Sequence, residues 1–277
     1  AERKDTKHMM NRIELKQEAK GVVRTAAVSA YLFALLYLAL TELLQGASVY
    51  VNGDVALYMQ TYFPNVPIPS YLYPVALPAT VVTLVAVVCW LLRVLLQGGW
   101  VLYHLGVRRG EEMPYATLFD GFGFIGKLIL LNIVITLYVF LWSMLFVFPG
   151  IIAYYRYSFA LYNLYEDPEM DIMEALNLSK RQTQGYKMEL FKLDLSYMGW
   201  ILLSILPSLF FTSQAILTLG FSGMDPYAAL AAPMPLWQIL TASAFVYALS
   251  IFYLPNYQCV QLAYFDAAKE DMPEFHS

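Results

Sequence analysis

An apolar tract from Lys127 to Tyr165 is the feature that most constrains how this chain can fold. A helix needs about 20 apolar residues to cross the hydrocarbon of a bilayer, and this tract is roughly twice that length. Phe148-Pro149-Gly150 interrupts it near the middle, where proline cannot continue a helix and glycine permits a turn. The tract therefore predicts a hairpin of two membrane-spanning helices.

The overall composition indicates the same class of protein. Of the 277 residues, 59% are apolar or aromatic and 14% are charged, and the mean hydropathy is +0.53. Soluble domains carry about 25% charged residues. Disordered chains, disulfide scaffolds and nucleic-acid binders need more polar residues or more cysteine, so the composition excludes these classes and predicts an integral membrane protein.

Other apolar stretches of the chain are also long enough to cross a bilayer. We therefore expect an all-α membrane protein with six transmembrane helices in three hairpins and with amphipathic segments on the cytoplasmic side. The expected spans are approximately 25–44, 75–96, 127–148, 150–165, 190–211 and 236–265. They form one transmembrane domain (25–265), which follows a basic amphipathic segment (1–24) and precedes a short cytoplasmic tail (266–277).

The distribution of Lys and Arg predicts how the spans are oriented. Neither residue occurs between Glu42 and Pro74 or between Thr212 and Trp237, whereas seven basic residues precede the first span. Cytoplasmic loops of membrane proteins are enriched in Lys and Arg. We expect both termini to be cytoplasmic, and the two uncharged loops and the hairpin turn at Pro149 to lie on the other side.

A basic amphipathic stretch precedes each pair of spans on the expected cytoplasmic side. In the first of these, Leu15, Ala19 and Val22 recur at helical spacing, while Arg12 and Lys16 occupy another face. Helices of this kind lie in the plane of the lipid headgroups. The pattern suggests a repeated unit of a surface helix and a hairpin, which would place a central site between repeats.

Most of the chain resembles a family of bacterial integral membrane proteins known as domain of unknown function 975. The strings that carry the resemblance are Leu15-Lys16, Ala19-Lys20, Arg108-Arg109-Gly110-Glu111, Leu118-Phe119-Asp120-Gly121-Phe122, Leu141-Trp142, Phe148-Pro149-Gly150-Ile151-Ile152-Ala153, Arg156-Tyr157, Asp167-Pro168, Ala175-Leu176, Ser179-Lys180, Gly185-Tyr186-Lys187, Leu190-Phe191, Leu195-Ser196 and Gly199-Trp200. The resemblance implies a six-span protein of the bacterial inner membrane. It implies no reaction, because the family is named for lacking one.

Arg156 is the most informative candidate for a functional site. It follows Pro149 by seven residues and precedes Tyr165 by nine, which places it near the middle of the expected span 150–165. A charge there costs at least about 2.5 kcal/mol, so the guanidinium should face the protein interior, a carboxylate or an anionic ligand. Two roles stay open: a structural clamp on carbonyl groups around Pro149, and a site for a ligand or ion.

Four further basic residues are candidates for lipid binding. Arg93 lies near the cytoplasmic end of its span, where we expect its side chain to reach toward the headgroups. Lys180, Arg181 and Lys187 follow the fourth span and would attract anionic phospholipid by about 1 kcal/mol per charge. The alternative is that these charges only set the orientation of the spans.

The sequence contains no constellation that suggests catalysis or metal binding. The three histidines are far apart, and each of the two cysteines lies in an apolar run, so we expect no enzyme activity, no cofactor and no metal. Five amide side chains lie in or near the spans, and we interpret them as forming hydrogen bonds between helices rather than a transport path. They are Asn132, Asn163, Asn256, Gln258 and Gln261.

Two functions are compatible with these features. In the first, the protein is a non-enzymatic membrane component that binds lipid or assists a membrane-protein partner, such as an export or envelope system. In the second, it is a small transporter or permease with a polar route past Arg156. The sequence favours the first, because basic amphipathic segments are present and catalytic groups are not. The expected ligands are membrane lipids, above all anionic phospholipid on the cytoplasmic side, and no nucleic acid.

Overall fold

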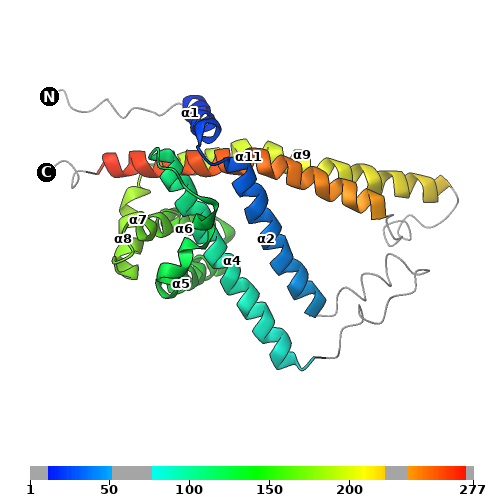
Figure 1. Cartoon of the computed structure of the whole chain (residues 1–277), viewed down its shortest axis with the longest axis horizontal. Helices are drawn as coiled ribbons and strands as arrows, with labels where there is room; N and C mark the ends of the chain where they lie inside the picture. Colours follow the sequence, from blue (N-terminus) through cyan, green and yellow to red (C-terminus); the bar gives the residue numbers. More distant parts are fainter. Residues whose placement is uncertain (1–11, 52–76, 222–235, 273–277) are drawn as a thin grey trace. The chain divides into compact units, whose positions relative to one another are not determined.

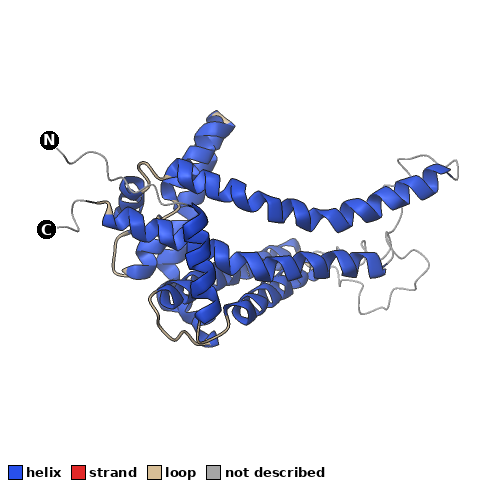
Figure 2. Cartoon of the chain, turned by 90° about the horizontal axis from the view of Figure 1, so that it is seen from above, coloured by secondary structure: helices blue, strands red, loops and turns tan. Residues whose placement is uncertain are grey.

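The computed structural model describes residues 12–51, 77–221 and 236–272, and within these ranges every regular element is a helix (Figures 1 and 2). The helices are α1 (Arg12–Thr25), α2 (Ala30–Val51), α4 (Ala79–Arg108), the 3₁₀ helix η2 (Tyr115–Phe124), α5 (Ile125–Leu145), α6 (Val147–Tyr157), α7 (Ala160–Glu166), α8 (Ile172–Gln182), α9 (Lys187–Phe221) and α11 (Leu236–Glu270). The expected all-helical fold is confirmed.

Four of these helices are long and apolar enough to cross a membrane: α2 over Ala30–Ser48, α4, α5, and α9 over Lys187–Gln214. The chain is therefore a membrane protein by the length and composition of its helices. The expected number of six spans is not confirmed. Over its described residues α11 is not among the four helices, and the expected span 150–165 is divided between α6 and α7.

The chain divides into two compact units, which we describe separately. The first contains residues 12–34, 95–197 and 253–272 of the described chain, and the second contains the remaining parts of α2, α4, α9 and α11. In the first unit the largest fully buried side chains include Tyr103, Phe159 and Phe265. All the candidate residues except Arg93 belong to this unit.

Glycines allow α4 and η2 to approach each other closely inside the first unit. A Cβ atom added to Gly99 would lie 2.1 Å from the carbonyl oxygen of Leu118, and one added to Gly121 would lie 2.8 Å from the carbonyl oxygen of Leu95. No side chain fits in either place. The backbones of the two helices are therefore in direct contact, and Leu118 between them is fully buried.

The expected hairpin is present, but its turn lies earlier than the sequence suggested. The chain leaves the helical conformation at Phe146, and Pro149 lies in the first turn of α6. Proline is tolerated there because the first N–H groups of a helix have no partner within the helix. Gly150 serves a packing role instead, since an added Cβ would lie 2.0 Å from the hydroxyl oxygen of Ser143 in α5.

The returning leg of this hairpin is a broken helix. Helices α6 and α7 both contact α5, and Lys127 in the first turn of α5 donates a hydrogen bond to the carbonyl of Pro168, just after α7 (2.6 Å). The segment formed by α6 and α7 thus runs back along α5 as far as the first turn of α5. The single helix expected over 150–165 is wrong, because the helical hydrogen bonds are interrupted at Ser158 and Phe159.

Side chains from α8 satisfy the backbone groups at this break. The hydroxyl of Ser179 donates to the carbonyl of Arg156 (2.9 Å) and accepts from the N–H of Phe159 (3.2 Å). Thr183 donates to the same carbonyl (3.3 Å). Buried backbone groups without partners would be costly, so Ser179, itself fully buried, permits the helix to break here.

Helix α1 packs on other helices of the first unit, and its expected position in the headgroup plane stays a prediction. Leu15, Ala19 and Val23 are buried. The Arg12 guanidinium donates to the carbonyl of Lys192 in α9 (3.3 Å), and the Lys16 ammonium lies 4.3 Å from the centre of the Tyr197 ring. The apolar stripe and two of the basic residues of α1 are thus used within the first unit.

Candidate functional site

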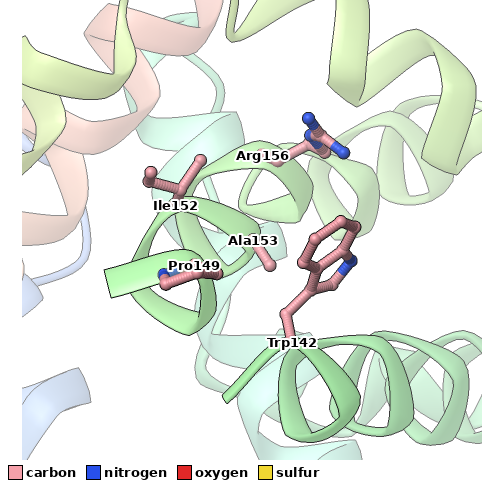
Figure 3. Close-up of a pocket in the computed structure, with 5 residues that line it drawn as sticks. All are labelled: Trp142, Pro149, Ile152, Ala153 and Arg156. Atoms are coloured by element: carbon pink, nitrogen blue, oxygen red, sulfur yellow. The ribbon is translucent and has the colours of Figure 1, made fainter. Parts of the chain in front are cut away.

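A small pocket lies between α5 and α6 in the first unit (Figure 3). Its volume is about 130 Å³, and it is lined by Trp142 of α5 and by Pro149, Ile152, Ala153 and Arg156 of α6. The four α6 residues share one helix face, because their spacing follows the helical repeat. The Trp142 indole extends from α5 toward Ala153 and Arg156. The pocket therefore has apolar walls and one cationic group.

The guanidinium of Arg156 has no fixed partner among the described residues. Its Nε is buried without a hydrogen bond, and the side chain forms no ion pair in the described part of the chain. Among the described residues no hydrogen bond joins this guanidinium to a carbonyl near Pro149, so the interpretation of Arg156 as a clamp gains no support from this structure. The backbone carbonyl of Arg156 accepts a hydrogen bond from Ser179 at the break between α6 and α7, and the side chain of Arg156 lines the pocket.

Two of the predicted lysines share the electrostatic environment of Arg156. Lys187, in the first turn of α9, experiences the positive charges of both Arg156 and Lys180. Like charges repel, so bringing these three groups together is unfavourable unless an anion lies among them or water screens them. Lys187 is thus within electrostatic range of Arg156 and Lys180, although the sequence placed Arg156 in a different segment from the two lysines.

The other two predicted residues do not join this group. Arg181 lies exposed in the last turn of α8. Arg93 belongs to the second unit, where its guanidinium donates to the side-chain carbonyl of Gln45 in α2. Arg93 is thus paired with a neighbouring helix, and its expected reach toward headgroups stays a prediction.

The size and walls of the pocket restrict what it can bind. Sites for drug-sized molecules usually measure about 300–1,000 Å³, so a pocket of 130 Å³ holds only part of such a ligand. Trp142 and Ile152 are 41% and 51% exposed, which makes the apolar wall continuous with the outer surface of the hairpin. The arrangement suits an amphiphile whose anionic end meets Arg156 while its apolar part lies along α5 and α6.

A chain of polar side chains, not anticipated from the sequence, crosses the first unit. The Trp100 indole N–H donates to Gln258 (3.1 Å), Gln258 to Tyr162 (3.2 Å), and Tyr162 to Gln261 (2.9 Å). Gln261 then donates to the hydroxyl of Tyr257 (2.6 Å), which donates to the carboxylate of Asp194 (2.6 Å). This polar chain links α4, α11, α7 and α9.

The amide side chains confirm one part of the sequence interpretation. Gln258 and Gln261 form hydrogen bonds between helices in the polar chain, and Asn163 of α7 exchanges two hydrogen bonds with Gln182 of α8 (2.8 and 2.9 Å). The spacing of Tyr257, Gln258 and Gln261 on one helix was the available signal for a polar face. The sequence around Asp194, at the other end of the polar chain, shows no comparable spacing of polar residues.

Within the described ranges no group of three or more His, Cys, Asp or Glu side chains could hold a metal ion.

Comparison with known proteins yields a family but no characterised relative. Residues 144–270 match a family model described as "Protein of unknown function (DUF975)". The match confirms the resemblance over α6 to α11, whereas the strings up to and including Leu141-Trp142 lie outside it. No curated protein and no solved structure matches the chain.

Proposed function

This chain belongs, over residues 144–270, to the domain of unknown function 975 family, and we propose that it is a non-enzymatic membrane protein that binds a phospholipid through the lipid phosphate. The observation that carries the proposal is the guanidinium of Arg156, which has no partner among the described residues and lies at the end of an open, apolar-walled pocket. A phosphate accepts several hydrogen bonds from the planar fork of an arginine.

The charges around the pocket support an anionic headgroup. Lys180 and Lys187 add positive charge beside Arg156, and each basic residue near a bilayer surface contributes about 1 kcal/mol of attraction to anionic lipid. In the orientation proposed from the Lys and Arg distribution, the end of the site with Lys180 and Lys187 faces the cytoplasmic leaflet of a bacterial inner membrane, and the end with Pro149 faces the other leaflet. Binding of this kind could serve an export or envelope partner in the same membrane.

Replacing Arg156 with methionine should remove the stabilisation that phospholipid gives the protein. Hydrogen bonds to charged groups contribute about 1.5–3 kcal/mol, so we expect the affinity for phosphatidylglycerol to fall roughly tenfold to hundredfold. Without added lipid the variant should be at least as stable as the parent, because an unpaired charge has been removed. Thermal unfolding in detergent, with and without phosphatidylglycerol, measures both effects.

Two further variants control this experiment. Arg156→Lys keeps the charge but loses the planar fork, so its affinity should lie between those of the parent and Arg156→Met. Arg24→Met removes an exposed arginine of α1 and should leave the effect of lipid unchanged. If Arg156→Met is stabilised by phosphatidylglycerol as strongly as the parent, the proposal is wrong.

The break between α6 and α7 favours a permease as the second candidate function. Transporters commonly place broken helices at their substrate sites. In that case Arg156 would line a route for an anion, and reconstituted protein should conduct an anion across liposomes. Flux that Arg156→Ala abolishes would support the permease, whereas lipid binding without flux supports the first proposal.

The proposed orientation can be tested by cysteine labelling of intact cells. Cysteines at Gly53 and Gly223, which lie outside the described residues, should react with an impermeant thiol reagent. A cysteine at Gln184, exposed between α8 and α9, should not react. Gln184 is preferable to Gly185, whose φ of 90° disfavours any side chain. The native Cys89 and Cys259 are buried. Labelling at Gln184 from outside would overturn the orientation.

A further inference from the structure

Asp194 is a carboxylate without a cationic partner in the part of the chain that the structure describes. Its two oxygens accept hydrogen bonds from the hydroxyls of Tyr155 and Tyr257, each 2.6 Å long. No Lys, Arg or His side chain among the described residues forms an ion pair with it. Asp194 is partly exposed, so an external cation can reach it.

The polar chain holds this carboxylate in a fixed position. From Trp100 through Gln258, Tyr162, Gln261 and Tyr257, every donor points toward Asp194. Hydrogen bonds aligned in one direction polarise one another, which strengthens the last bond in the series. Amide and indole N–H groups do not pass protons along, so the polar chain is unsuited to proton conduction. Its last donor, the Tyr257 hydroxyl, is directed at the Asp194 carboxylate.

Exposed aromatic rings lie beside the carboxylate. Tyr154 is 50% exposed, interacts electrostatically with Asp194, and packs edge to face on Tyr155 with ring centres 5.1 Å apart. Phe191, one turn before Asp194 on α9, is 42% exposed and lies edge to face against Tyr155, 6.3 Å between ring centres. Aromatic rings together with a carboxylate form the usual recognition site for an ammonium group.

The same two helices carry the negative site and the positive one. On α6, Tyr155 contacts Asp194, and the following residue is Arg156. On α9, Lys187 experiences the charge of Arg156, and Asp194 follows two helical turns later, about 10 Å along the same face. The helices α6 and α9 of the first unit thus carry both the cationic groups and the anionic group.

We propose that this pair of sites binds an aminophospholipid, with the lipid phosphate on Arg156 and Lys187 and the lipid ammonium on Asp194, Tyr154 and Phe191. The inference rests on the proposed function, because it assumes that the phosphate binds at Arg156. It adds that the headgroup carries a positive as well as a negative charge. A headgroup with a phosphate alone would leave Asp194 unpaired.

Two lipids that differ only in the amino group provide the test. Dioleoyl phosphatidylethanolamine has the ammonium, and dioleoyl phosphatidylethanol has a hydrogen in its place. We expect the full-length protein in detergent to bind phosphatidylethanolamine at least fivefold more tightly, as measured by native mass spectrometry. Asp194→Asn should lower the affinity for phosphatidylethanolamine about tenfold and leave that for phosphatidylethanol unchanged or higher.

Two variants keep the outcomes separate. Arg156→Met should weaken binding of both lipids equally, and if it weakens neither, the proposed phosphate site is wrong. If Arg156→Met weakens both lipids but Asp194→Asn does not change their ratio, only the ammonium site is wrong. Tyr154→Leu alters an exposed ring outside the polar chain, so it should reduce the preference for phosphatidylethanolamine even if Asp194→Asn disturbs the fold. An unchanged preference in Tyr154→Leu would contradict the ammonium site.

Discussion

Gly99→Ala should destabilise the protein by about 3 kcal/mol, although alanine is the better helix former. The added methyl group would lie 2.1 Å from the carbonyl oxygen of Leu118 and 2.5 Å from its Cα atom. These are backbone atoms, so no side-chain rotation relieves the clash. Overpacking typically costs about 1–3 kcal/mol. The upper end applies because moving η2 away from α4 would also open the close contact of Gly121 with Leu95.

A matched substitution separates the clash from the change in helix propensity. An alanine at Gly126, in the first turn of α5, would meet no atom within 4 Å. Gly126→Ala should therefore be neutral or stabilising by up to about 1 kcal/mol. Thermal unfolding of both variants in the same detergent gives the comparison. Equal stability of Gly99→Ala and the parent would show that α4 and η2 do not touch in this way.

Tyr162→Phe should cost about 2–4 kcal/mol, because it removes the central hydroxyl of the polar chain. That hydroxyl donates to Gln261 and accepts from Gln258, and phenylalanine would leave both amide groups without this partner. Each buried polar group left unsatisfied costs about 1–3 kcal/mol. The loss should appear as a lower unfolding temperature and as faster hydrogen exchange in α7 and α11.

Tyr157→Phe is the control for this substitution. Tyr157 lies in the same hairpin leg and its ring stacks on Tyr138, with 5.6 Å between the ring centres, a contact that phenylalanine retains. We expect a change of less than about 0.5 kcal/mol, as for substitutions outside such networks. If Tyr162→Phe is as mild as Tyr157→Phe, the polar chain does not contribute to the stability of the first unit.

Local sequence patterns predict much of the fold. The structure differs from these predictions where contacts between helices distant in sequence determine the backbone. The length of the apolar tract after Lys127 was enough to predict a hairpin. The break at Ser158 could not be predicted, because neither Ser158 nor Phe159 is a helix breaker and the stabilising hydroxyl belongs to Ser179 on α8. Gly99 likewise looks like an ordinary small residue of a membrane helix until η2 packs against it.

The candidate site was predictable to the extent that its charges stand out from an apolar background. Arg156 is conspicuous for this reason, and Lys180 and Lys187 belong to an evident basic cluster. The sequence could not predict that these two lysines share the electrostatic environment of Arg156, because this depends on how α8 and α9 pack near α6. The role of Asp194 was not predictable, since its hydroxyl donors come from α6 and α11.

The end of α6 one residue after Arg156 has an electrostatic consequence for ligand exchange. The aligned peptide dipoles of a helix leave about half a negative charge at its C-terminus, which favours a cation in the last turn by about 0.3–1 kcal/mol. The guanidinium is thus partly neutralised by the backbone of its own helix. An incoming phosphate competes with this weak, diffuse charge and has no salt bridge with a described residue to break, so lipid should enter the pocket quickly.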